Sequence, residues 1–234
     1  MTSQTNPVAR HEAPYPSNAR YDAVVFDLLT ALIDSWSIWN SVAGSKEDGL
    51  KWRKEYLKLT YGAGKYRPYE DIVAEAAVNA GFPSSYAENL AARWGRLMPW
   101  PEVKNVLRQL APATKLAVVT NCSIELGRKA ALQTFDGFDV IVTAEEAGFY
   151  KPCREPYAMA LDQLGSSPDR TLFVAGSASD VPGASALGMP VYWHNRINLP
   201  SINEVSPTFL ERSLDRLVDI VLDTNRGVAA SQGE

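Results

Sequence analysis

The sequence predicts an α/β fold: a doubly wound (Rossmann-like) parallel sheet with an inserted all-helical cap. Short apolar runs alternate with helical patterns after residue 99, as they do in consecutive βαβ units. An earlier run, at residues 23–26, is apolar at every position, which is typical of a strand buried on both faces of a parallel sheet. Between residues 35 and 98 only helical patterns appear, and we interpret this stretch as the cap.

The composition is that of a globular chain. It has 234 residues, of which 46% are hydrophobic, and a net charge of −4, which gives no indication of a nucleic acid or a membrane as partner. Residues 1–20 contain no apolar signal-peptide core and are interpreted, like residues 225–234, as disordered. The two cysteines, Cys122 and Cys153, suggest no metal or disulfide framework, so a reducing cytoplasm is the expected location.

The core is predicted to come from two separate parts of the chain, residues 21–34 and 99–224, with the cap at 35–98 between them. Apolar residues at helical spacing, bounded by Pro and Gly, predict three cap helices. They cover residues 48–61, 69–81 and 86–97. In the second part of the core, Pro101 opens the first helix and Gly165 ends the third. The helices there are expected at 101–111, 123–135, 154–165, 180–188 and 207–224, and the strands at 115–121, 138–146, 170–177 and 189–195.

Polar residues follow the predicted strands, where the chain leaves the sheet. They are Asp27, Thr120, Asn121, Lys151, Ser177 and Asp180. Because the carboxyl ends of parallel strands meet at one edge, where open α/β sheets bind ligands, we expect these side chains to lie together. Each also has an ordinary interpretation. Asp27 and Asp180 are suited to capping the turn or helix that follows them, and Lys151 to a place on the surface.

The order of these segments, and the position of the cap, resemble the haloacid dehalogenase superfamily from about residue 21 to 196. The resemblance implies that Asp27 is a nucleophile, which a positioned and desolvated carboxylate can be. Lys151 would keep Asp27 ionised, and Asp180 would hold Lys151 or orient the hydrolytic water. Thr120 and Asn121 would offer hydrogen-bond donors to a substrate carboxylate or an oxyanion.

The residues around Asp27 depart from the phosphatases of this superfamily. In those enzymes a second Asp stands two residues after the nucleophile, where this chain has Leu29, and an acidic residue of the last loop helps to bind magnesium, where this chain has Gly176 or Ser177. Asp27 and Asp180 alone make a poor magnesium site. We therefore expect no metal and no cofactor, and keep a magnesium-dependent small-molecule phosphatase as an alternative.

Two further motifs are similar to the L-2-haloacid dehalogenase branch. Trp52-Arg53 matches a Trp-Arg pair of the cap, and Lys151 to Tyr157 matches the pattern Lys-Pro-x-x-x-x-Tyr. The resemblance implies attack of Asp27 on C2 of a small carboxylic acid, followed by hydrolysis of the ester to a 2-hydroxy acid of inverted configuration. It also implies that Arg53 faces the leaving halide, although a solvated arginine on a basic helix surface is the alternative.

The pocket differs from this branch next to the nucleophile. The Tyr-Gly-Thr of the dehalogenases is Leu29-Thr30-Ala31 here. A similar scaffold opens L-azetidine-2-carboxylate to 4-amino-2-hydroxybutyrate, with a strained ring nitrogen as leaving group. Trp36 and Trp39 could face such a cation, or they could pack the cap against the core.

The expected function is therefore displacement of a ring nitrogen or a halide from C2 of a small carboxylic acid. The substrate-binding residues would be Arg53, Leu29, Trp36, Trp39, Tyr157 and Ser177. A catalytically silent binding protein on this scaffold is another alternative, because a fold does not determine a function. A homodimer is one assembly that the sequence permits.

Overall fold

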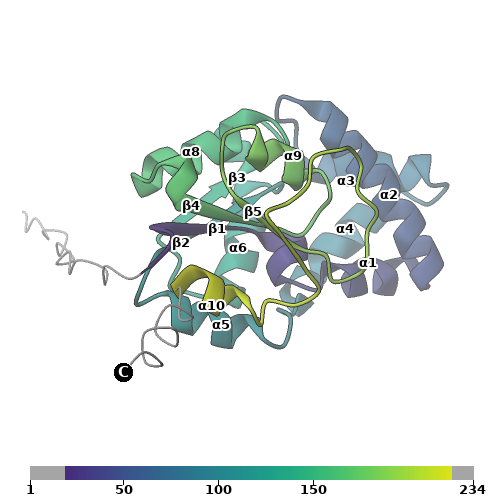
Figure 1. The fold of residues 1–234 in the computed structure, drawn as a ribbon. Coiled ribbons are helices and arrows are strands. Elements are labelled where there is room, and N and C mark those ends of the chain that lie inside the picture. Colours follow the sequence, from purple (N-terminus) through teal and green to yellow (C-terminus); the bar gives the residue numbers. More distant parts are fainter. Residues whose placement is uncertain (1–18, 223–234) are drawn as a thin grey trace, which may run out of the picture.

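A computed structural model describes residues 19–222 of the chain. Its centre is a six-stranded parallel sheet with the strand order β3-β2-β1-β4-β5-β6. The strands are β1 (Ala23–Asp27), β2 (Lys115–Thr120), β3 (Val140–Thr143), β4 (Thr171–Ala175), β5 (Val191–His194) and β6 (Phe209–Glu211). Helices cover both faces, as Figure 1 shows, so the predicted doubly wound α/β fold is confirmed.

The central strand β1 is buried at all five positions because it contributes to two separate cores. Val24 and Phe26 pack on the side of α5 (Val103–Leu110), α6 (Ile124–Thr134) and α10 (Leu217–Leu222). Ala23 and Val25 pack on the side of α8 (Arg154–Leu164) and α9 (Asp180–Ser185). This two-sided burial explains why the sequence of β1 shows no polar alternation.

The cap consists of four helices that lie together beside the carboxyl edge of the sheet (Figure 1). They are α1 (Ser35–Ala43), α2 (Lys46–Ala63), α3 (Tyr69–Asn79) and α4 (Tyr86–Ala92). The sequence did not predict α1. Local capping accounts for it, since the Asp34 carboxylate accepts a hydrogen bond from Ser37 N and Gly44 ends the helix with φ +88°.

The predicted helix over 207–224 is wrong in its first half. Residues Phe209–Glu211 form β6, which pairs with β5, and only α10 (Leu217–Leu222) is helical. The apolar spacing over residues 209–211 fits an edge strand as well as a helix. In the structure this segment forms a strand because it pairs with β5. No helix in the described part of the chain has both the length and the apolar character needed to cross a membrane. The predicted arm 1–20 lies almost wholly, and the predicted tail 225–234 wholly, outside the described residues.

The chain leaves β1 through one turn of π-helix, Leu28–Leu32, that packs directly against the end of β4. Gly176 follows β4, and a Cβ atom at this position would overlap with the backbone of Thr30 and Ala31. Only a residue without a side chain permits this close approach. Gly176 therefore fixes the distance between the turn after Asp27 and the loop that leads to Asp180.

Gly176→Ala should destabilise the protein by about 3 kcal/mol, because the added methyl group has to displace main-chain atoms rather than a flexible side chain. The matched control is Gly62→Ala on α2, where a Cβ meets no atom within 4 Å. That change should be neutral or stabilise the protein by up to about 1 kcal/mol. Denaturant unfolding of both variants measures the difference, and an equal effect of the two would contradict the close approach at Gly176.

Candidate active site

Asp27 ends β1, and its two carboxylate oxygens have different partners. Oδ2 accepts hydrogen bonds from Thr30 N at 2.9 Å, from Ala31 N at 3.2 Å and from the Thr30 hydroxyl. Oδ1 accepts one from Lys151 Nζ at 2.8 Å. Asp27 thus does cap the turn that follows it, but this capping occupies one oxygen only.

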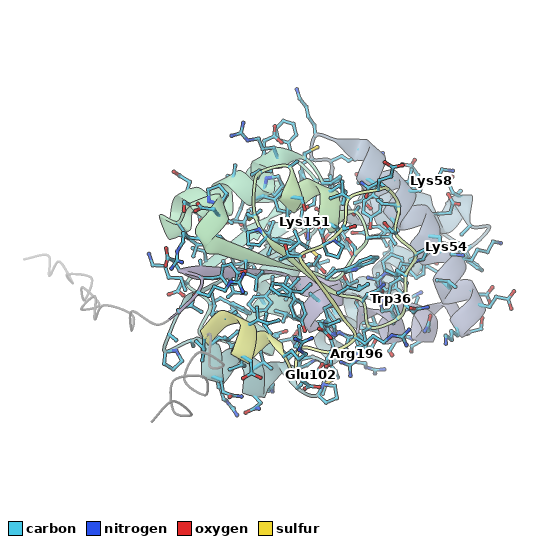
Figure 2. All side chains as sticks on the ribbon, in the orientation of Figure 1. Trp36, Lys54, Lys58, Glu102, Lys151 and Arg196 are labelled. Carbon is cyan, nitrogen blue, oxygen red and sulfur yellow. The ribbon has the colours of Figure 1, made fainter. Side chains whose placement is uncertain are left out.

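Lys151 lies between two buried carboxylates, and Figure 2 shows it at the edge of the sheet that faces the cap. Its Nζ is 2.8 Å from Asp27 Oδ1 and 3.2 Å from Asp180 Oδ2. The side chain of Asn121 binds both the carbonyl and the N–H group of the Lys151 backbone. Its Nδ2 donates to the Lys151 carbonyl at 3.0 Å, and its Oδ1 accepts from Lys151 N at 2.7 Å. Asn121 therefore positions Lys151, and the second N–H of its amide remains available in the cavity that it lines.

Asp180 is held on both oxygens. The Tyr157 hydroxyl donates to Oδ1 at 2.7 Å, and the Ser177 hydroxyl donates to Oδ2 at 2.9 Å. Tyr157 is 1% exposed and is not among the residues that line the cavity, so it orients Asp180 instead of contacting substrate as predicted.

The pKa values of the two carboxyl groups in this cluster shift in opposite directions. Burial raises the pKa of any carboxyl, but at Asp27 the Lys151 ammonium and the hydrogen bonds from Lys151 and Thr30 outweigh burial, and the pKa is lowered. At Asp180 burial and the negative charge of Asp27 outweigh Lys151, and the pKa is raised. Burial alone would lower the pKa of Lys151, yet the two carboxylates raise it. Asp27 is thus the more persistent anion, and Asp180 the stronger proton acceptor.

Arg53 brings a second buried cation from α2, on the cap side of the cavity. Its side chain is 2% exposed, and its Nη1 donates to the Ser35 hydroxyl at 2.8 Å, while Nε has no hydrogen-bond partner among the described residues. Within residues 19–222 no carboxylate lies at ion-pair distance from it. A buried charge without a counterion is costly, so this position favours an anion supplied by substrate.

Trp36 and Trp39 do not line the cavity, contrary to the prediction that they face a substrate cation. The Arg53 guanidinium lies 3.9 Å from the centre of the Trp36 ring and 5.6 Å from that of Trp39. Trp39 also packs against Trp52 at 4.4 Å. The two rings therefore support Arg53 and the cap interior, and Trp36 is seen on the cap side in Figure 2.

The cavity itself is small, with a volume of about 40 Å³. It is lined by Asp27, Leu29, Thr30, Arg53, Tyr56, Leu57, Tyr61, Thr120, Asn121, Lys151, Ser177 and Asp180. Sequence reasoning missed four of these, Thr30, Tyr56, Leu57 and Tyr61. The signal for the last three was present, because residues three, four and eight positions after Arg53 lie on the same side of a helix.

The outer side of α2 is basic, but Arg53 alone among the basic residues of this helix lines the cavity. Lys54 and Lys58 are exposed and project from the outside of α2 (Figure 2). The alternative of a solvated Arg53 therefore does not hold. Thr120 Oγ1, on the core side, is buried and has no oxygen or nitrogen partner within residues 19–222, so it can bind a substrate atom.

The residues at this site do not fit a magnesium ion. Residues 19–222 contain no group of three His, Cys, Asp or Glu side chains arranged to hold a metal. Both oxygens of Asp180 already accept hydrogen bonds, and Leu29 stands where a phosphatase has its second aspartate. The ammonium of Lys151 lies between the two carboxylates that a magnesium ion would have to share.

A buried aspartate paired with a lysine at the carboxyl edge of a parallel sheet, beside a helical cap, is the arrangement of a hydrolase of the haloacid dehalogenase type. The chain belongs to the haloacid dehalogenase-like hydrolases, whose family model matches residues 21–188. It is 27% identical over 221 residues to haloacetate dehalogenase H-2 of Moraxella sp. (strain B), covering 86% of this chain and 98% of that one. It is 29% identical over 189 residues to the (S)-2-haloacid dehalogenase of Xanthobacter autotrophicus, covering 72% and 73% of the two chains.

The fold is also that of a solved dehalogenase. The L-2-haloacid dehalogenase of Xanthobacter autotrophicus with chloropropionic acid covalently bound superposes with a TM-score of 0.77 at 21% identity, over 86% of this chain and 98% of that one. The predicted superfamily is confirmed, and the protein is an enzyme of the hydrolase class.

Lys151→Met should lower kcat by about 100- to 1000-fold, because it removes the charge that keeps Asp27 ionised. Without the ammonium, burial dominates and the pKa of Asp27 rises, so the acid limb of kcat/KM should move to higher pH. Lys104→Met, an exposed lysine of α5, is the control and should leave the pH profile unchanged. An acid limb that stays in place in a folded Lys151→Met protein would contradict this role of Lys151.

Proposed function

We propose that Asp27 attacks C2 of a small carboxylic acid and displaces its substituent, forming an aspartyl ester that water hydrolyses to the 2-hydroxy acid of inverted configuration. The unequal bonding of the Asp27 oxygens carries this proposal. Oδ2 is held by Thr30 and Ala31, whereas Lys151 is the only described hydrogen-bond partner of Oδ1. Oδ1 is therefore the attacking atom, and Oδ2 becomes the carbonyl oxygen of the ester.

The turn after Asp27 is suited to stabilise the intermediate of the second step, hydrolysis of the aspartyl ester. When water adds to the ester carbonyl carbon, negative charge develops on Oδ2, where the N–H groups of Thr30 and Ala31 already point. Donors fixed in advance on such an oxygen are the main feature of an oxyanion hole. The water attacks Asp27 and not C2, so the configuration set in the first step is kept in the product.

Asp180 is the proposed base for the hydrolytic water. Burial, the largest cause that raises the pKa of Asp180, is still present when Asp27 is esterified, and it favours uptake of a proton by this carboxylate. Once Asp27 is esterified and has lost its charge, Lys151 retains Asp180 as its single carboxylate partner in the cluster. The same lysine thus stabilises the nucleophile before the first step and the base after it.

The leaving group has to depart without an acid at position 29, where the side chain of Leu29 cannot donate a proton. Two leaving groups meet this requirement: the protonated ring nitrogen of L-azetidine-2-carboxylate, whose departure relieves ring strain, and a halide, as in an (S)-2-haloacid dehalogenase proper. Arg53 can bind the halide or the substrate carboxylate. The dehalogenase activities of the relatives support a halide, and the change of Tyr-Gly-Thr to Leu29-Thr30-Ala31 supports the nitrogen.

The size of the cavity supports a small substrate. A volume of about 40 Å³ has room for only a few water-sized groups, which favours a substrate with few heavy atoms.

In a single turnover in oxygen-18 water, label should enter Asp27 and not the first product molecule, since water attacks the enzyme carbonyl. Mass spectrometry of the peptide that contains Asp27, after several turnovers, detects the label. Asp27→Asn should abolish turnover and remain folded. Labelled product on the first turnover would mean that water is the nucleophile at C2.

Treatment with EDTA should leave kcat/KM unchanged within about twofold, because the ligands that a magnesium ion needs are not assembled at this site. The matched measurement is hydrolysis of p-nitrophenyl phosphate with added magnesium, which we expect to be negligible. Activity that is lost with EDTA and returns with magnesium would favour the phosphatase alternative.

A further inference from the structure

The inner side of α2 offers the cavity two polar groups of different kind. Arg53 and Tyr61 both line the cavity, and the eight residues between their positions correspond to about 12 Å along the helix axis. Tyr56 and Leu57 lie between them on the same side. Both polar side chains are long and the cavity is small, so one small molecule can contact both.

Tyr61 belongs to a cluster of three hydroxyl groups. Tyr61 lines the cavity together with Ser177, and the neighbouring Ser177 and Ser179 hydroxyls lower the pKa of its phenol against the larger effect of burial. Ser177 Oγ is 3.2 Å from Ser179 Oγ and donates to Asp180 Oδ2 at 2.9 Å. Burial raises the pKa of Tyr61, so the phenol is neutral and can accept or donate a hydrogen bond.

Two parts of the cavity lining have opposite preferences for a ligand group. Arg53 is a buried cation without a carboxylate partner within residues 19–222, and it favours an anion. The Ser177 hydroxyl, which is bonded to Asp180, and the Tyr61 phenol line the same cavity, and their oxygens favour an N–H donor that carries positive charge. A molecule with a carboxylate and an ammonium group on the same carbon satisfies both preferences.

We propose that Tyr61, supported by Ser177 and Ser179, is the subsite for a protonated leaving nitrogen, and that Arg53 binds the substrate carboxylate. This inference rests on the proposed displacement at C2 and names its substrate class: zwitterionic 2-carboxylates of strained nitrogen rings. Tyr61 comes from the cap helix α2 and Asp27 from β1 of the core, and both line the same cavity.

The reaction balances with the groups present. The Asp27 Oδ1–C2 bond forms as the C2–N bond breaks, its electron pair goes to nitrogen, and the ammonium departs as a neutral primary amine that the Tyr61 oxygen accepts as a hydrogen-bond donor. Hydrolysis of the ester gives one proton of water to the alcohol oxygen and the other to Asp180. From Asp180 this proton can pass through Ser177 and Tyr61 to the amine, which leaves as ammonium.

The first test compares kcat/KM for L-azetidine-2-carboxylate and L-2-chloropropionate in the wild type and in Tyr61→Phe. Loss of one hydrogen bond to a charged group should lower the value for the azetidine about 10- to 100-fold and leave that for the chloro acid within about threefold. Tyr86→Phe is the control, a cap tyrosine that stacks on Phe82 and does not line the cavity, and it should change neither value. An equal loss on both substrates, or no loss on the azetidine, overturns the subsite.

A second test measures binding without turnover and so separates this inference from the proposed function. In Asp27→Asn, calorimetry compares L-azetidine-2-carboxylate with cyclobutanecarboxylate, a ring of the same size that has CH₂ in place of the ammonium. We expect about tenfold tighter binding of the azetidine, and a clear reduction of this preference when Tyr61→Phe is added. Equal affinities overturn the subsite even if the chloro acid is hydrolysed. If the wild type turns over neither acid but the tighter binding of the azetidine is present, the proposed reaction is contradicted and the subsite is retained.

Discussion

One buried ammonium between two buried carboxylates determines how the rest of this site is built. Asp27 ends β1, Lys151 lies in the loop after β3, and Asp180 begins α9, so three separate segments meet at a single nitrogen atom. Removing charges from water is costly, and pairing together with hydrogen bonds offsets this cost. The neighbouring polar residues contribute to this: Asn121 holds the backbone of Lys151, and Tyr157 fixes Asp180.

The turn after Asp27 shows that a structural and a chemical role need not compete for one side chain. Capping uses Oδ2, and the same two N–H groups are placed to receive the charge of the proposed intermediate. The turn is held from outside as well. Trp100 Nε1 donates to the Thr30 carbonyl at 3.2 Å, and His194 Nδ1 lies 2.8 Å from the Ala31 carbonyl oxygen. Because the Thr30 carbonyl and the Ala31 N–H belong to one planar peptide group, the bond from Trp100 also helps to fix the direction of the Ala31 N–H.

The sequence was most informative where topology alone brings residues together. Parallel strands carry their ends to one edge, so Asp27, Lys151 and Asp180 could be grouped without any knowledge of side-chain packing. The cap was harder to predict, because the direction of its side chains depends on how its helices pack on the core. Trp36 was therefore predicted to contact substrate, although its ring packs against Arg53. Tyr61 was not predicted, although it lies on the same inner side of α2 as Arg53 and lines the cavity.

Leu29 links the two halves of the site through its backbone and not its side chain. The Ser35 hydroxyl donates to the Leu29 carbonyl and accepts a hydrogen bond from Arg53 Nη1. In the phosphatases of this superfamily the same position supplies an acid. Here its carbonyl instead anchors, through one serine, the cation that the cap brings to the cavity of Asp27. The position of Arg53 is thus set by the turn after Asp27 as well as by α2.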